Sequence, residues 1–177
     1  NVAKQWKIGR EEQDEFAFNS QQKYAAAKAA NKWDDEIAAV ELNNKGMISW
    51  IVYDEHPRAT SLEKLGTLKP AFIKNGTVTA GNSSGINDGS AAMLLASEEA
   101  VKKYNLSPLA KVTSMAVAGV DPAIMGIGPV PATQKALQRA GLKINDIGMI
   151  ELNEAFASQS IACIRDLRLD SKKVNVN

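Results

Sequence analysis

Apolar strand-like runs alternate with helix-like segments through the second half of the chain, and this alternation constrains the fold more than any other feature. The strand-like runs lie at 91–96, 110–119, 147–152 and 173–176. The helical patterns between them lie at 98–104, 132–140 and 154–167. Strands that alternate with helices are typical of a mostly parallel sheet whose faces are covered by helices. The sequence therefore predicts an α/β fold.

The first half has a different organisation. A segment from about Gly9 to Asn31 is rich in alanine, lacks proline and has acidic residues in its first turns, which predicts one long helix. Alternating runs at 36–42 and 48–53 predict two short strands. Around His56-Pro57-Arg58 the regular pattern ends. The chain therefore contains parts of two structurally different regions.

A strand-like run meets a helical pattern at Asn153 and Glu154, and this corner is the most informative local feature. Free backbone N–H groups at such a corner bind ligands at the carboxyl ends of strands. The alternative is structural, because Asn is a favoured N-cap residue and Glu complements the helix dipole. Both interpretations of Asn153 stay open on these residues alone.

The segment from Gly76 to Gly89 is the second candidate. Its glycines let the backbone turn tightly and approach a ligand, while Asn82, Ser83 and Ser84 offer hydrogen-bonding groups of little bulk. An amide-bearing or phosphate-bearing ligand fits this composition, and a plain loop is the alternative. The segment has neither the Gly-Lys-Ser/Thr ending of a Walker A loop nor the spacing of a dinucleotide fingerprint.

Composition excludes several classes of function. The 177 residues are 45% hydrophobic and 23% charged, and 21 Lys and Arg nearly balance 20 Asp and Glu, so no overall field favours nucleic acid or a membrane surface. No apolar run is long enough to span a bilayer. One cysteine, Cys163, and one histidine, His56, make a poor metal site, and Cys163 is predicted to be a small core residue.

Three motifs together resemble the thiolase family of acetyl-CoA acetyltransferases and 3-ketoacyl-CoA thiolases. They are Gly76–Gly89, Gly126–Ala132 and Glu151–Ala157, and the likeness covers essentially the whole chain. The loop Asp54–Arg58 is similar to that of degradative ketoacyl-CoA or ketoadipyl-CoA thiolases, which is a weak discriminator. The resemblance implies an acyltransferase of fatty acid metabolism, including β-oxidation, acting on coenzyme A thioesters.

The resemblance also implies a partial thiolase-like fold. The family fold has two similar βαβαβ halves, and an α+β loop domain inserted in the first half covers coenzyme A. On this template residues 1–86 belong to the loop domain, 87–108 end the first half, and 109–177 begin the second half.

Site residues follow from the same resemblance. Asn153 would be catalytic, holding a water that helps to form an oxyanion hole for the thioester carbonyl. Ser84 would hydrogen-bond the pantetheine amide. The other implied substrate-binding positions are Ala80, Ser83, Ile86 and Phe72 beside the pantetheine arm, Arg58 near the adenine, and Met125 and Phe156 at the acyl end. Three lysines of the irregular segment either meet the 3′-phosphate or form a solvated face: Lys64, Lys69 and Lys74.

In the family the activity requires two cysteines and a histidine that these 177 residues do not match. The nucleophilic cysteine precedes the matching segment, and the Gly-His-Pro histidine and Cys-Gly-Gly cysteine follow it. Neither Cys163 nor His56 fits those motifs. We therefore expect the 177-residue chain alone to lack thiolase activity and to expose apolar surface, and we expect neither a metal nor a cofactor beyond the coenzyme A thioester substrate.

Two hypotheses remain. The first is that the chain is the central part of a catalytic thiolase, a homodimer or homotetramer at full length. Such an enzyme would be cytoplasmic in a bacterium, with mitochondria and peroxisomes as alternatives. The second is a non-catalytic thiolase-like module that binds acyl-CoA or pairs with another subunit. Substrate chain length and the direction of the reaction stay open.

Overall fold

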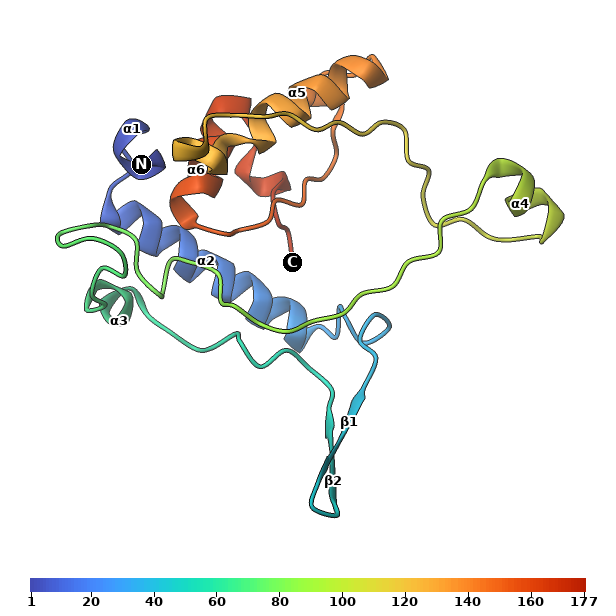
Figure 1. The fold of residues 1–177 in the computed structure, drawn as a ribbon, viewed down its shortest axis with the longest axis horizontal. Coiled ribbons are helices and arrows are strands. Elements are labelled where there is room, and N and C mark those ends of the chain that lie inside the picture. The colour runs from blue at the N-terminus through green and yellow to red at the C-terminus, as the bar shows by residue number, and fades with distance from the viewer.

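The computed structural model describes residues 1–177 and shows a packed body with two extensions (Figure 1). The helices are α1 (Val2–Gln5), α2 (Arg10–Ala29), α3 (Leu62–Gly66), α4 (Glu98–Lys103), α5 (Pro129–Ala140) and α6 (Ala157–Leu167). Three 3-10 helices accompany them: η1 (Pro122–Ile127), η2 (Ile144–Asp146) and η3 (Ser171–Lys173). The strands are β1 (Val40–Asn44) and β2 (Met47–Ile51).

The long helix predicted in the first half is confirmed as α2. It runs beneath α6 and beside α3 in Figure 1, and it contacts both. Gly9 precedes it in an extended conformation, and Asn31 follows it with a positive φ of 54°. The helix therefore contacts both segments that carry the candidate site, through Asp14 to Asn82 and through Ser20 to Glu154.

Helix ends in the second half follow their local signals. The Oγ atom of Ser97 accepts a hydrogen bond from the Ala100 amide at 3.1 Å and so caps α4. Pro129 occupies the first turn of α5, where its missing N–H costs nothing. Gly141 ends α5 in the left-handed conformation, with φ of 68°. The helices predicted at 98–104 and 132–140 are thus confirmed as α4 and α5, although α5 begins at Pro129, three residues before the predicted start.

The start of α6 differs from the prediction. The helix begins at Ala157 and Phe156 is its N-cap residue, so the interpretation of Asn153 as the cap is wrong. The physical reason is a competing partner: the Ser84 amide donates to the Ala155 carbonyl, and the Ala157 amide donates to the Asn82 carbonyl, both at 3.0 Å. The helix therefore starts later than predicted because the glycine-rich loop pairs with the Ala155 carbonyl and the Ala157 amide.

The two strands of the first half form an antiparallel hairpin. Val40 pairs with Ile51 and Asn44 with Met47, so the strands are shifted from the predicted 36–42 and 48–53. Lys45 and Gly46 make the turn with φ of 52° and 90°, the positive values that a tight hairpin turn requires. The hairpin projects from the body, and nearly all its residues are exposed (Figure 1).

The strands predicted at 91–96 and 110–119 are not formed. A strand is stabilised by ladder bonds to a neighbour, and neither segment has one in this chain. The backbones of the predicted runs at 147–152 and 173–176 pair only in a parallel bridge between Ile150 and Val174. The unpaired segments instead loop out to α4 and back (Figure 1), and we call residues 86–120 the limb.

The hydrophobic core lies where α1, α6 and η1 meet. It contains six buried residues: Ile8, Ile127, Val130, Ile161, Ala162 and Cys163. Trp6 packs against this cluster, and its indole Nε1 donates to the Asp166 carboxylate at 3.0 Å. Only 17 of the 177 residues are buried, so the core is small for the length of the chain. No helix is long and apolar enough to cross a bilayer.

Candidate functional site

The glycine-rich loop lies directly against the Asn153-Glu154 corner. Two backbone hydrogen bonds join them, from the Ser84 amide to the Ala155 carbonyl and from the Ala157 amide to the Asn82 carbonyl, and Ser83 and Phe156 form an antiparallel bridge. A cavity of about 250 Å³ opens beside this junction. It is lined by Phe16, Ala17, Ser20, Gln21, His56, Gly81, Asn82, Ser83, Ser84, Asn153, Glu154 and Ala157. The two motifs singled out in the sequence therefore form one site.

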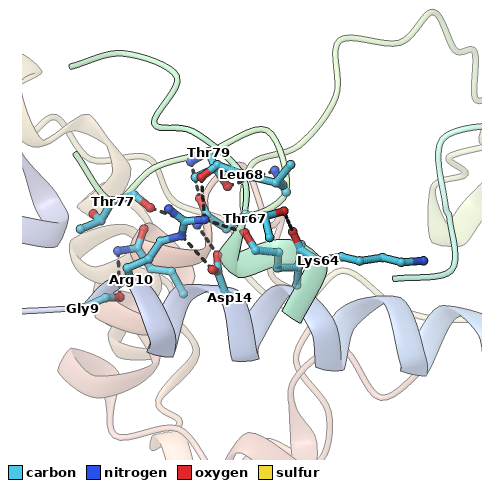
Figure 2. A network of polar contacts seen from close by, with 12 residues as sticks. Gly9, Arg10, Asp14, Lys64, Thr67, Leu68, Thr77 and Thr79 are labelled. Atoms are coloured by element: carbon cyan, nitrogen blue, oxygen red, sulfur yellow. Dashed lines mark hydrogen bonds and ion pairs between the residues drawn. The ribbon is translucent and has the colours of Figure 1, made fainter. Parts of the chain in front are cut away.

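A buried polar network joins the glycine-rich loop to α2 (Figure 2). The Asn82 Nδ2 atom donates to Asp14 Oδ1 at 2.8 Å and to the Thr77 carbonyl at 3.1 Å. Its Oδ1 atom accepts from the Thr79 amide at 2.9 Å. The Asn82 side chain thereby closes the turn from Thr77 to Asn82 and ties it to α2.

Arg10 completes this network. Its Nε atom donates to Asp14 Oδ2 at 2.7 Å, and Nη2 donates to the carbonyls of Leu65 and Leu68 at 2.6 and 2.9 Å. Figure 2 shows the Arg10 side chain reaching from α2 toward Leu68, beside α3. The Asp14 side chain is only 6% exposed, and a carboxylate so buried requires a partner. The network thus fixes the loop, α2 and α3 in one arrangement.

Glu154 joins the corner to α2 and to the C-terminal segment. The Oε2 atom of Glu154 accepts from the Ser20 hydroxyl at 2.6 Å, and Oε1 accepts from Asn175 Nδ2 at 2.7 Å. Neither Ser20 nor Asn175 stood out as a site residue in the sequence, because Ser20 is 134 positions away from Glu154. Only the fold brings these side chains together.

The structure brings five of the predicted site residues together. Ser83, Ser84 and Asn153 line the cavity, and the Asn153 side chain is exposed with no hydrogen-bond partner in the chain. Phe156 pairs with Ser83 through the backbone. Its ring meets that of Phe72 edge-on, with centroids 6.3 Å apart. Ser83, Ser84 and Asn153 therefore share one cavity, and the Phe72–Phe156 pair adjoins it through the backbone pairing of Phe156 with Ser83.

Arg58 lies at the edge of the cavity and does not line it. Its amide donates to Gln21 Oε1 at 3.1 Å, and its guanidinium Nε donates to the His56 carbonyl at 3.3 Å. Five predicted residues are exposed and do not line the cavity: Ala80, Ile86, Met125, Phe72 and Phe156. The exposed lysines of the irregular segment do not line it either: Lys64, Lys69 and Lys74.

His56 lines the cavity, although it matches no catalytic motif and was not predicted as a site residue. Its ring packs onto Gly85 so closely that a Cβ atom at position 85 would lie 2.5 Å from its Cε1 atom. Glycine at this position is therefore required by the close approach of the ring. The signal that was available in the sequence is the glycine itself.

Cys163 is a core residue, as predicted, and lies outside the cavity. Burial raises the pKa of its thiol, nearby Asp166 raises it further, and a hydrogen bond from Gln159 offsets part of this. Its Sγ atom lies 3.5 Å from the Gly126 carbonyl, which accepts from the thiol. A buried thiol with a raised pKa is a weak nucleophile at neutral pH.

Comparison with known proteins identifies the family. Residues 1–99 match the family model described as thiolase, N-terminal domain, and residues 106–177 match that of thiolase, C-terminal domain. The chain is 51% identical to the mitochondrial 3-ketoacyl-CoA thiolase of Homo sapiens and 53% identical to the acetyl-CoA acetyltransferase of Escherichia coli strain K12. Each alignment covers 100% of the chain and 45% of the relative. The chain therefore belongs to the thiolase family.

Solved structures show the same fold. A crystal structure of human mitochondrial 3-ketoacyl-CoA thiolase matches with a TM-score of 0.96 at 50% identity, covering 100% of this chain and 45% of that one. A structure of that enzyme in complex with CoA matches at 0.95 and 50% identity, covering 100% and 44%. The α/β, partial thiolase-like fold predicted from the sequence is thus confirmed. The internal boundaries at 86 and 108 stay a prediction.

Proposed function

We propose that this chain supplies the coenzyme A-binding loop and the oxyanion-hole asparagine of an acyl-CoA thiolase. The enzyme forms or cleaves 3-ketoacyl-CoA through a cysteine acyl-enzyme and a Claisen condensation. The observation that carries the proposal is that Ser84 and Asn153, far apart in sequence, line one cavity. The chain spans about 45% of its relatives' length, so the activity is proposed for the whole protein.

The roles of the residues follow from the charge that develops in the reaction. Acyl transfer and Claisen chemistry both place negative charge on a thioester carbonyl oxygen, which donors fixed in advance stabilise. The Asn153 amide faces the cavity with no competing protein partner, so it is free to hold the water that donates to that oxygen. The Ser84 hydroxyl would bind the pantetheine amide, Phe72 would pack beside the arm, and Phe156, whose ring meets that of Phe72, would shape the acyl end.

The remaining chemistry lies with residues outside this chain. Its one cysteine is buried, with a raised thiol pKa, so the proposed nucleophile and the acid–base cysteine and histidine come from the rest of the protein. The same observation supports the second candidate, a thiolase-like module that binds acyl-CoA or pairs with a subunit without catalysis. Coenzyme A serves as substrate, and we propose no metal or other cofactor.

We propose a homodimer or homotetramer for the full-length protein. The chain exposes many large apolar side chains, among them Leu94, Leu95 and Met115, each at least 74% exposed. Surfaces of this kind are covered in a complete domain or at an interface between subunits. The sedimentation velocity of the full-length protein tests the assembly, and a monomer at micromolar concentration would contradict it.

Turnover by the full-length protein tests the proposed function. The enzyme is incubated with coenzyme A and a series of 3-ketoacyl-CoA substrates of increasing length, and the acyl-CoA products are separated by chromatography and identified by mass spectrometry. We expect thiolysis, a kcat reduced roughly 10²–10³-fold by Asn153→Ala, and a raised KM for Ser84→Ala. Binding of acyl-CoA without turnover would contradict the enzyme and support the non-catalytic module.

A further inference from the structure

We propose that Glu154 is a positioning residue that aims Asn153 into the site, and that Ser20 and Asn175 hold Glu154 in place. The inference rests on the proposed function, since it concerns the geometry of the residue to which that proposal gives the oxyanion hole. It gives a role to the side chains of Glu154, Ser20 and Asn175, which neither the sequence motifs nor the cavity lining explains.

The carboxylate of Glu154 is held at both oxygens. Ser20 donates to Oε2 at 2.6 Å from α2, and Asn175 donates to Oε1 at 2.7 Å from the C-terminal segment. Hydrogen bonds to an ionised carboxylate are shorter and stronger than bonds between neutral groups. Two such bonds from different elements leave the Glu154 side chain one orientation.

Asn175 also holds the backbone on the other side of Asn153. Its Oδ1 atom accepts from the Leu152 amide at 2.7 Å, and its Nδ2 atom donates to the Leu152 carbonyl at 2.8 Å. One amide side chain therefore fixes the residue before Asn153 and the carboxylate after it.

Asn153 itself has no protein partner for its side chain. Its direction is therefore set by its neighbours: Leu152 and Glu154 are clamped by Asn175, and the Ala155 carbonyl accepts from the Ser84 amide at 3.0 Å. A functional side chain that must keep its donors free for a water or substrate is best aimed in this indirect way. The geometry meets that requirement.

A purely structural role for Glu154 is the competing account. The Ser20 bond ties α2 to the corner, and a tie of this kind can stabilise the fold without any effect on chemistry. The two accounts differ in the kinetic parameter that they change. Misplacing Asn153 lowers kcat at saturating substrate, because an error of about 1 Å in a reacting group costs roughly 10²-fold. Loss of a tie alone lowers the melting temperature and leaves kcat unchanged.

Variants of the full-length enzyme separate these accounts. We expect Glu154→Ala to lower kcat roughly 10- to 100-fold with little change in KM. Glu154→Gln should recover most of it, because an amide still accepts from Asn175 and donates to the Ser20 oxygen. Asn175→Ala should lower kcat as much as Glu154→Ala does. Ser20→Ala should lower kcat less, and Ser20→Thr, which keeps the hydroxyl, should leave kcat close to that of the unmodified enzyme.

Matched controls come from exposed asparagines without side-chain hydrogen bonds. Asn19→Ala, one residue before Ser20 in α2, and Asn145→Ala in η2 should leave kcat unchanged. Thermal melts of every variant identify those that fail to fold. The Ser20→Ala and Ser20→Thr pair keeps the test decisive if Asn175→Ala does not fold.

The deciding experiment combines Glu154→Ala with Asn153→Ala. If Glu154 acts through Asn153, the double variant has the same kcat as Asn153→Ala alone. Multiplied losses, or a Glu154→Ala variant with normal kcat, would overturn the positioning role while a large Asn153→Ala effect still supports the proposed function. An Asn153→Ala variant with normal kcat would overturn both.

Discussion

Helix α6 and the limb from 86 to 120 have similar sequence textures but opposite environments. Residues 157–163 of α6 are all buried, whereas residues 84–99 are all exposed. Both segments mix small polar and apolar residues, and Met93 and Leu94 of the limb are more than 80% exposed. A helix satisfies its own backbone and needs only a surface to pack on, whereas a strand needs a neighbour for every bond. Burial in this chain therefore follows the elements that can form from local bonds.

Amide exchange of the 177-residue chain should show the largest difference between the two regions. The structure has no backbone hydrogen bonds donated from residues 86–96 or 107–120, so these amides should exchange at close to the rate of an unfolded peptide. Amides in the last two turns of α6 should open with a free energy of about 3 kcal/mol and exchange roughly 100-fold more slowly. Equal exchange in both regions, measured by mass spectrometry, would contradict the comparison.

Removal of a buried carboxylate should cost more than removal of an exposed one. Asp14→Ala leaves Arg10 and Asn82 without their shared partner and should lower the free energy of unfolding by about 3–5 kcal/mol, enough to unfold most of the 177-residue chain before urea is added. The control is Glu98→Ala in α4, whose pair with Lys102 is largely exposed and should change it by less than about 0.5 kcal/mol. Urea unfolding followed by circular dichroism measures both. Similar losses would show that the Asp14 network is not a buried anchor.

Gly81 and Gly89, two glycines of the segment from Gly76 to Gly89, compare a packed position with an exposed one. A Cβ atom at position 81 would lie 2.5 and 2.6 Å from the methyl carbons of Leu68 and Leu65, whereas one at position 89 meets nothing within 4 Å. Gly81→Ala should therefore destabilise by about 1–3 kcal/mol. Gly89→Ala should be neutral or stabilise by up to about 1 kcal/mol, because it restricts the unfolded chain. The same urea experiment measures the pair, and the reverse order would show that the loop packs differently.

The pH dependence of stability should report the burial of Cys163. Burial, the largest cause, raises the pKa of this thiol in the folded chain, so the folded state keeps a proton that the unfolded state loses. Stability is therefore unaffected below the pKa of an unfolded cysteine, about 8.5, and falls as the pH rises from there through the raised value.

The matched control for that prediction is Cys163→Ala. The variant should be less stable at neutral pH because it removes a buried group, but it should lack the part of the alkaline decline that belongs to the thiol. Urea midpoints at several pH values between 7 and about 10 measure this. Identical alkaline profiles for both proteins would place Cys163 outside the core.

The helices were predictable because their signals are local. The Ser97 cap, Pro129 in the first turn of α5 and the left-handed Gly141 each act within a few residues. The strands predicted in the limb, at 91–96 and 110–119, do not form, because these segments have strand composition but no partner strand within the chain. Composition predicts the tendency to pair, and only a neighbour completes the strand.

The candidate site was predictable in part, for a related reason. Ser84 and Asn153 stood out through their motifs, and the fold places both at one cavity. Ser20 and Asn175 carry no motif of their own, and their role depends on contacts that span 134 and 21 positions. The structural alternative, in which Asn153 caps α6, is wrong because pairing with the glycine-rich loop overrides the local capping preference.

The central claim is that the glycine-rich loop and the Asn153 corner bind one thioester between them. A crystal structure of the full-length protein with a bound acyl-CoA tests it most directly. We predict that the pantetheine amide lies within hydrogen-bond distance of the Ser84 hydroxyl and that a water held by Asn153 contacts the thioester carbonyl. A thioester bound away from this cavity, with Ser84 and Asn153 both free of contact, would contradict the claim.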